Sequence, residues 1–238
     1  MLHADTRQFS APIGPAFRPR SFPEPAAPDS LDDCFANSRL CRIEAKEFVF
    51  MEGDAVKQVY RIEAGAVSLY RLLPDGRRQI LGFAYPGDVI GLGVQREYIM
   101  NAQALKPTKL RSMSLAALHR IAAQDPELSF TLYQTVANEL TATRDLLMTT
   151  GHRSACERVA AFLLTLSQRN ERKGESAHVI ELPMTRSDIA DFLGLTVETV
   201  SRTISKMKTG RLIDLPQCAR IHLRDIEALQ ALAGGGGE

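Results

Sequence analysis

The segment 185–208 constrains the fold of this chain most, because it reads as two short helices around a tight turn. Thr185 can cap the first helix, and Asp188, three residues on, completes the pattern of a capping box. Gly194 can end that helix with a positive φ, and Thr196 can cap a second one. The sequence therefore predicts a helix, a glycine turn and a second helix.

The apolar residues of this segment fall on one face of each predicted helix, as they must in order to share a small core. Two short helices that pack on each other across a glycine turn are typical of a DNA-reading helix-turn-helix. The expected core consists of Ile189, Ala190 and Leu193 in the first helix, Leu195 in the turn, and Val200, Ile204 and Met207 in the second helix.

The opposite face of the second helix is polar. Glu198 and Arg202 are four residues apart, so their side chains emerge next to each other. Arginine can donate two parallel hydrogen bonds to guanine, and glutamate can accept one from the amino group of cytosine. The two residues could also form an ordinary surface ion pair, but the surrounding motif favours base reading. We predict that Val197, Glu198, Ser201 and Arg202 read bases.

Positive charge gathers around this segment although the chain carries a net charge of only +1. Residues 152–224 hold 12 Lys/Arg and eight Asp/Glu, a net charge of +4. Arg202, Lys206, Lys208 and Arg211 follow one another without an intervening acid, which suits contacts to phosphates. Cations at a helix end also complement the helix dipole, so the patch alone is a weak signal. We expect phosphate contacts from Lys206 and Lys208.

Composition excludes several classes of protein. No apolar run approaches the roughly 20 residues that span a membrane, so we expect a cytoplasmic protein without a membrane partner. No Ser/His/Asp set, carboxylate pair or phosphate-cradling glycine loop stands out, so we expect no enzyme. No C-x-x-C motif occurs, which argues against a structural metal site. We expect reduced thiols at all four cysteines, Cys34, Cys41, Cys156 and Cys218, and the sequence leaves their response to oxidants open.

The first half of the chain divides into two parts. Residues 1–28 hold six of the 12 prolines and few large apolar groups, so we expect them to be disordered. Between residues 42 and 115, short β-rich runs alternate with glycines at intervals of 11 or 12 residues. Asp75 and Gly76 lie between two such runs and predict a hairpin. This pattern is typical of an antiparallel sandwich, jelly roll or barrel.

A long helix and a small hairpin complete the pattern. No glycine or proline interrupts residues 127–150, and an apolar stripe near heptad spacing runs along them. The stripe could pack on the β domain, but its position between two domains favours a dimer helix. Two short runs around residues 216–219 predict a hairpin wing after the helix-turn-helix. The stripe consists of Leu132, Val136, Leu140 and Leu147.

We therefore predict an α+β fold with an N-terminal β-roll, a long dimerisation helix and a C-terminal winged helix-turn-helix. The expected boundaries are a disordered extension at 1–28, the β-roll at 29–125, the dimerisation helix at 126–150, the DNA-binding domain at 151–230 and a flexible tail at 231–238.

This order of elements resembles the Crp/Fnr superfamily of bacterial transcription regulators over about residues 40–230. The stretches that carry the resemblance are Phe50–Asp54, Tyr60–Tyr70, Tyr85–Asp88, Glu157–Leu163 and Leu195–Arg202. In the last of these, Glu198, Ser201 and Arg202 match the E-x-x-S-R pattern with which Fnr-type members read TTGA half-sites. The resemblance also implies that Arg186, Thr196 and Thr199 contact phosphates.

The sensory residues of the family do not carry over. Leu92 and Tyr98 stand where members that bind cyclic AMP have a glutamate and an arginine, so the phosphate would lose its charge-assisted partner. Oxygen-sensing Fnr proteins bind an iron–sulfur cluster through N-terminal cysteines and one cysteine in the β-roll. Here the first 33 residues hold no cysteine, and Arg111 lies about where the cysteine of the roll should be. We therefore expect neither cyclic AMP nor a cluster, and no other cofactor.

An Fnr-like reader without the cluster is similar to the FixK group, which residues 71–79 and 182–186 also resemble. That resemblance implies an activator of genes for low-oxygen respiration or nitrogen fixation, controlled through its own synthesis. Its expected partners are double-stranded DNA, a second copy of the chain and RNA polymerase. The candidate polymerase contacts are Asp75, Gly76, Arg77, Gly87 and Asp88.

Two alternatives stay open at this point. One is a regulator of the same superfamily that needs haem, a redox change or a small effector. The other is a nucleotide-binding signalling module whose helix-turn-helix contacts protein.

Overall fold

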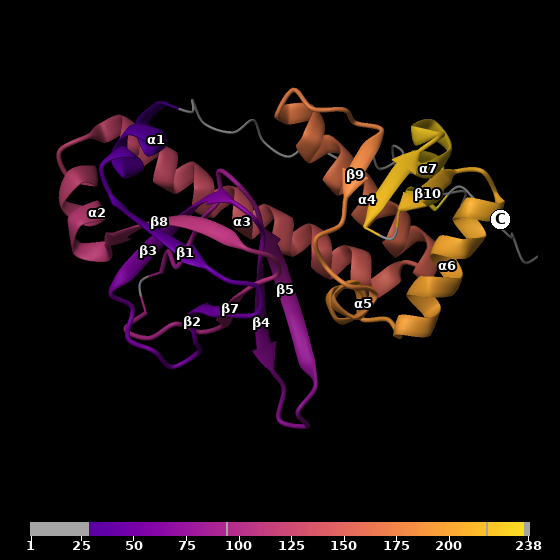
Figure 1. The fold of residues 1–238 in the computed structure, drawn as a ribbon, viewed down its shortest axis with the longest axis horizontal. Helices are drawn as coiled ribbons and strands as arrows, with labels where there is room; N and C mark the ends of the chain where they lie inside the picture. The colour runs from indigo at the N-terminus through magenta and orange to yellow at the C-terminus, as the bar shows by residue number, and fades with distance from the viewer. Residues whose placement is uncertain (1–28, 94, 218, 236–238) are drawn as a thin grey trace, which may run out of the picture.

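The computed structural model describes residues 29–93, 95–217 and 219–235, which form two lobes joined by a long helix (Figure 1). The expected disorder of residues 1–28 concerns a segment outside the described residues. No described helix combines the length and the apolar character that a membrane crossing would need. The α+β fold that the sequence predicts is confirmed.

The N-terminal lobe is a β-roll of two four-stranded antiparallel sheets. One has the strand order β1-β8-β3-β6 and the other β2-β7-β4-β5. Their apolar faces enclose a core that includes Ile62, Val67, Ala102 and Leu110. The strands are β1 (Arg39–Ile43), β2 (Phe48–Phe50), β3 (Gln58–Ala64), β4 (Val67–Leu72), β5 (Arg78–Ala84), β6 (Val89–Ile90), β7 (Asn101–Ala104) and β8 (Thr108–Ser114).

Tight glycine turns close the roll. Gly65 has φ +102°, and a Cβ there would lie 2.3 Å from Thr108 Oγ1, so only glycine fits between the strands. The predicted hairpin at Asp75 and Gly76 joins β4 to β5 and projects away from the rest of the lobe (Figure 1). Gly76 donates its backbone N–H to the carbonyl of Leu73 at 2.9 Å.

Two helices close one end of the roll: α1 (Asp29–Ala36), which the sequence did not reveal, and α2 (Leu115–Ala122). Phe35 of α1 is fully buried against Val59, Leu118 and Leu128. Arg61 pairs with Asp32, which further holds α1 on the roll. The described part of the chain therefore begins with a helix that seals the core.

The long helix α3 (Pro126–His152) starts at an Asp125 cap that accepts from Glu127 N and Leu128 N at 3.0 Å each. It continues two residues beyond its expected end at 150, through Gly151. One glycine in a helix costs only about 1 kcal/mol, so it does not break this one. The break comes at Arg153 and Ser154, because Ser154 and Glu157 form the capping box of the next helix.

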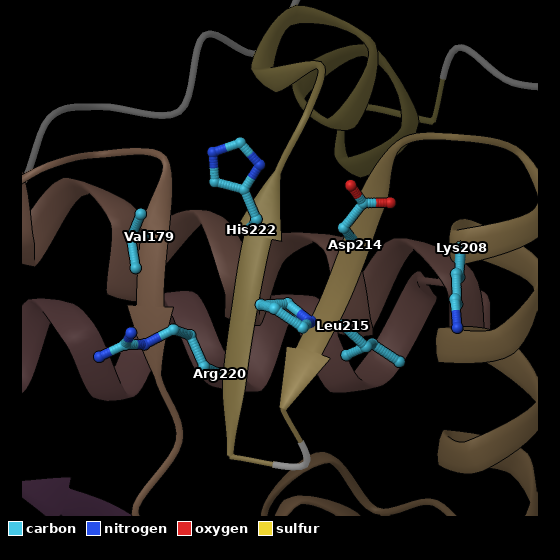
Figure 2. Close-up of a pocket in the computed structure, with 7 residues that line it drawn as sticks. Val179, Lys208, Asp214, Leu215, Arg220 and His222 are labelled. Atoms are coloured by element: carbon cyan, nitrogen blue, oxygen red, sulfur yellow. The ribbon is translucent and has the colours of Figure 1, made fainter.

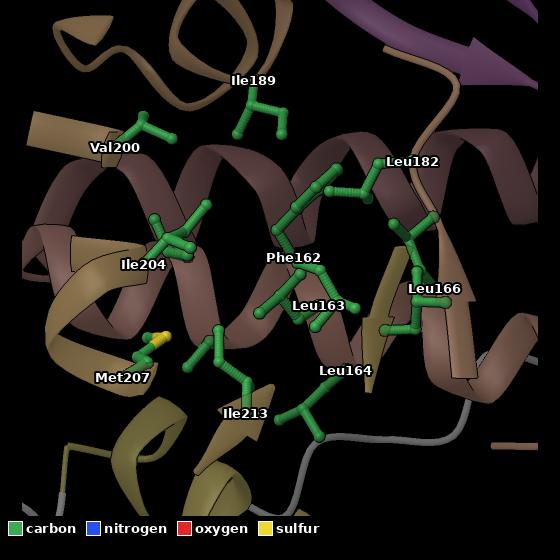
Figure 3. Packing of buried hydrophobic residues seen from close by; sticks show 14 of the residues in the cluster. Phe162, Leu163, Leu164, Leu166, Leu182, Ile189, Val200, Ile204, Met207 and Ile213 are labelled. Atoms are coloured by element: carbon green, nitrogen blue, oxygen red, sulfur yellow. The ribbon is translucent and has the colours of Figure 1, made fainter. Parts of the chain in front are cut away.

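The C-terminal lobe is a winged helix-turn-helix built around α4 (Ala155–Arg172). Figure 3 shows side chains of α4 packing between those of the two motif helices and the small sheet. That sheet has the order β10-β11-β9. The remaining elements are β9 (Val179–Glu181), α5 (Arg186–Leu193), α6 (Val197–Thr209), β10 (Ile213–Gln217), β11 (Arg220–Leu223) and α7 (Ile226–Ala233).

Two of these elements depart from the expected boundaries. β9 adds a third strand beside the predicted hairpin, with Ile180 facing the core. α7 runs to Ala233 and buries Leu229 against the lobe, so residues 231–233 belong to the domain and not to a flexible tail. Residues 236–238 lie outside the described part.

Candidate nucleic-acid interface

The two helices of the motif begin and end as their sequence predicts. Thr185 Oγ1 accepts from Asp188 N at 3.1 Å, and the Asp188 carboxylate accepts from Thr185 N at 2.8 Å, which forms a complete capping box. Gly194 adopts φ +64° between the helices. Thr196 then caps α6 by accepting from Thr199 N at 3.1 Å. Local hydrogen bonds therefore fix the turn that orients α6.

The predicted core of the motif is buried, except for Leu195, which is half-buried, and the opposite face of α6 lies in solvent. Val200, Ile204 and Met207 point into the core. Val197, Glu198, Ser201 and Arg202 are all exposed on the outer face. Arg202 Nε lies 3.9 Å from Glu198 Oε1, with 73% and 78% of the two side chains exposed. An ion pair this open is weak. Each of the two side chains can therefore leave the pair and form hydrogen bonds with base edges instead.

The candidate phosphate contacts border this face in two ways. Lys206 and Lys208 are exposed in the last turn of α6. Thr196 is exposed, and its hydroxyl lies 2.8 Å from that of the half-buried Thr199. Arg186, at the first position of α5, is half-buried. The structure thus brings hydroxyls to the N-terminal end of α6 and ammonium groups to its C-terminal end.

A shallow cavity of about 390 Å³ lies between the C-terminal end of α6 and the outer face of the wing (Figure 2). Lys208 lines it from α6, and Arg220 and His222 line it from β11. Arg220 also pairs with Glu181 at 2.9 Å. Cations therefore continue from the helix onto the wing.

The face of α3 that points away from the lobes is apolar. Val136, Leu140 and Leu147 are exposed there, with Leu147 67% exposed. Leu132, which also belongs to the predicted stripe, is half-buried, because it packs on the cluster of the β-roll that includes Leu128. The exposed row instead includes Tyr133, which is 69% exposed. Leu132 lies about 80° around the helix from Leu140, at 100° a residue, so spacing alone could not exclude it.

The candidate polymerase contacts lie at two places. Asp75, Gly76 and Arg77 form the exposed tip of the β4–β5 hairpin, where Arg77 Nε donates to Asp75 Oδ2 at 2.7 Å. Gly87 and Asp88 lie instead at the junction of the lobes, where Asp88 Oδ1 accepts from Arg169 of α4 at 2.8 Å. The Asp88 carboxylate therefore has a partner within the chain.

Aromatic side chains pack around Tyr98, which stands at a position where the resemblance implies an effector contact. Tyr98 is 8% exposed and stacks on Phe50, with ring centroids 3.9 Å apart at 13°. Its hydroxyl donates to the carbonyl of Gln58 at 2.6 Å. Burial and the neighbouring Tyr98 raise the pKa of Tyr60 to about 12. Leu92 packs beside Phe35 and Val59. These residues offer no cation to a cyclic phosphate.

Arg111, which stands about where Fnr proteins have a cysteine, takes part in a purely protein network. Its guanidinium donates to the carbonyl of Ala36 at 2.6 Å and lies 3.3 Å from Glu63. Cys34, Cys41 and Cys156 are half-buried thiols, and Cys218 lies outside the described residues. Within the described ranges, no three His, Cys, Asp or Glu side chains gather as a metal site.

Two family models match the two lobes. Residues 157–232 match the Crp-like helix-turn-helix domain, and residues 40–125 match the cyclic nucleotide-binding domain. Together they cover both sides of α3 in the order that the sequence predicts.

Curated relatives and a solved structure share this arrangement. The chain is 38% identical over 195 residues to the nitrogen fixation regulation protein FixK of Bradyrhizobium diazoefficiens, which covers 82% of each protein. It is 39% identical over 172 residues to the transcriptional activatory protein AadR of Rhodopseudomonas palustris, which covers 72% of each. The structure of FixK2 from Bradyrhizobium japonicum superposes with a TM-score of 0.77 at 35% identity, covering 82% of this chain and 96% of that one.

Proposed function

This chain belongs to the Crp/Fnr superfamily of transcription regulators, among its FixK-like members, and we propose that it activates transcription by binding TTGA-type palindromes as a homodimer. The proposed targets are genes for low-oxygen respiration or nitrogen fixation. The names of FixK and AadR support this choice, since one is a regulator of nitrogen fixation and the other an activator of transcription.

The observation that carries the proposal is the outer face of α6. Glu198 and Arg202 emerge together near the start of a helix whose other side is locked into the core. The N-terminal part of a recognition helix is the part that reaches base edges in the major groove. Arg202 then donates to guanine, and Glu198 accepts from cytosine. Val197 and Ser201 adjoin them and complete a surface suited to one half-site.

The exposed face of α3 supports a homodimer. Tyr133, Val136, Leu140 and Leu147 would each be buried against the same helix of a second copy. Such a two-fold contact places two recognition helices on one side of the DNA. Their centres would meet successive major grooves about 34 Å apart, which requires a palindromic site.

The packing of the β-roll supports an activator that binds DNA without an effector. A ligand in the roll would have to displace Tyr98 from its stack with Phe50 and from its hydrogen bond to Gln58. A cyclic phosphate would meet no arginine there to compensate. Control would then act on the amount of the protein. The hairpin tip at Asp75–Arg77 is the proposed contact to RNA polymerase.

A gel-shift experiment with the purified full-length protein tests this function. We expect a retarded complex on a TTGA palindrome at a concentration that leaves a scrambled duplex unshifted. Cyclic AMP, reductant or air should leave the affinity unchanged, and light scattering should give the mass of a dimer. A requirement for any of these additions would support an effector-dependent regulator, and equal affinity for both duplexes would contradict sequence-specific binding.

A further inference from the structure

One contact between the lobes joins residues 113 positions apart in the sequence. The guanidinium of Arg78, at the start of β5, reaches two carboxylates of α5. Its Nη2 donates to Asp188 Oδ1 at 2.5 Å and to Asp191 Oδ2 at 3.0 Å, and its Nε donates to Asp191 Oδ2 at 3.2 Å. Gln79 Nε2 donates to the Asp191 carbonyl at 2.9 Å. The β-roll therefore holds the first helix of the motif through side-chain and backbone groups.

The electrostatics of this contact depend on Arg78. Asp188 and Asp191 are three residues apart on one helix, so their charges repel. Only 6% of the Asp188 side chain and 28% of the Asp191 side chain are exposed, and burial disfavours a carboxylate without a partner. A planar guanidinium can serve both carboxylates at once, which an ammonium on a flexible stem does less well. Arg78 is thus the cation that compensates both acids.

An apolar contact lies beside the ionic one. The ring of Phe83 in β5 lies 5.3 Å from that of Phe192 in α5 and 6.3 Å from that of Phe162 in α4. Packed rings stabilise the interface, but they tolerate small shifts, whereas charge-assisted hydrogen bonds at about 3 Å fix its register. The Arg78 contact therefore defines how α5 sits on the β-roll.

The orientation of α6 follows from that of α5. The two helices share the core of the motif, so they move together. Only Arg153 and Ser154, both extended, link α3 to α4, and such a short extended link leaves rotation possible. Together with the contact of Arg169 in α4 to Asp88, the joint between β5 and α5 thus sets the direction of α6, while the outer face of α6 remains in solvent.

We propose that Arg78 and Asp191 are positioning residues for DNA binding. They fix the helix-turn-helix on the β-roll of its own chain in the arrangement in which both recognition helices of a dimer meet the DNA. This inference rests on the proposed function. The joint leaves Glu198 and Arg202 exposed to solvent. It therefore holds the helix-turn-helix in an arrangement that can bind DNA.

The test measures affinity of the full-length protein for a TTGA palindrome by fluorescence anisotropy. Arg78→Gln and Asp191→Asn should each weaken binding about tenfold, as expected when the competent arrangement falls to about a tenth of the population. The double variant should bind within about twofold of Arg78→Gln, because that change already breaks the pair with Asp191. The control Arg71→Gln, whose partner Glu52 lies within the roll, should bind like the parent. Parental affinity in both single variants, or tighter binding in either, would overturn the proposal.

A second readout separates positioning from simple stability. Trypsin cleavage after Arg153, followed by mass spectrometry, should be faster in Arg78→Gln and Asp191→Asn than in the parent and Arg71→Gln. Asp191→Asn should keep the parental unfolding midpoint of the DNA-binding domain, since it leaves the pair of Arg78 with the capping residue Asp188 in place. Cleavage at the parental rate in both variants would contradict the proposed joint, whether or not the parent binds DNA. Failure of the parent to bind the palindrome would contradict only the proposed function.

Discussion

The outer face of α6 and the interior of the β-roll are built in opposite ways. On α6, Glu198 and Arg202 form an open ion pair and are mostly exposed to solvent. In the roll, Tyr98 is stacked, hydrogen-bonded and almost fully buried. We propose on this contrast that the chain keeps its DNA-reading surface available and closes its sensory region with its own side chains.

The largest expected effect comes from opening the roll. Tyr98→Ala removes a buried ring and should lower the free energy of unfolding by about 3–5 kcal/mol, as large aromatic truncations do. Chemical denaturation measures this change. Tyr98→Phe keeps the ring and its stack on Phe50 and should cost only about 1 kcal/mol, because it removes the hydroxyl that bonds to Gln58 and Tyr60. A stable Tyr98→Ala variant would mean that the region is not part of the core.

A change on the outer face of α6 should instead weaken DNA binding and leave protein stability unchanged. Arg202→Ala should weaken palindrome binding by roughly 1–3 kcal/mol per half-site and relax the preference at one G·C pair. The unfolding midpoint should stay within error of the parent, because the side chain is exposed. Competition assays with single-base operator variants measure the preference. If the variant discriminates as well as the parent, Arg202 does not read a base.

A change at Thr196 should affect both protein stability and DNA affinity. Thr196→Ala removes the cap of α6 and should cost about 1 kcal/mol of stability, and it should weaken all DNA sequences alike if the hydroxyl also contacts a phosphate. Thr196→Ser retains the cap and provides the control. Thermal unfolding and anisotropy on two duplexes measure both effects. A weaker discrimination between the duplexes would show that Thr196 has a base-reading role.

The smallest expected effect is at Lys206. Lys206→Gln should weaken specific and scrambled duplexes by the same few-fold factor. It should also reduce the slope of log affinity against log salt by about 0.9 for each phosphate that the lysine no longer neutralises. A salt titration of the dimer measures this slope. An unchanged slope would place Lys206 away from the DNA backbone.

The parts of this fold that the sequence predicts are those with local causes. The helix-turn-helix follows from Thr185, Gly194 and Thr196, each of which acts within three or four residues of its own position. The β4–β5 hairpin likewise follows from Asp75 and Gly76. The residues that form the local hydrogen bonds of these elements lie within the elements themselves, so the sequence alone predicts where the elements are.

What the sequence did not reveal depends on interactions between distant residues. Arg78 reads as an ordinary strand cation until α5 brings Asp188 and Asp191 to it. Leu132 fits the heptad spacing but packs on the roll, whereas its neighbour Tyr133, which lies outside that spacing, is exposed. α1 has no strong local signal besides Phe35, whose burial is set by β3, α2 and α3.

A crystal structure of the ligand-free full-length protein on a TTGA palindrome would test the central claim most directly. We predict that Arg202 donates two hydrogen bonds of about 2.7–3.2 Å to the O6 and N7 of the half-site guanine, with Tyr98 still stacked on Phe50. An Arg202 side chain on the phosphates, or a Tyr98 displaced from the roll by a bound molecule, would contradict this claim.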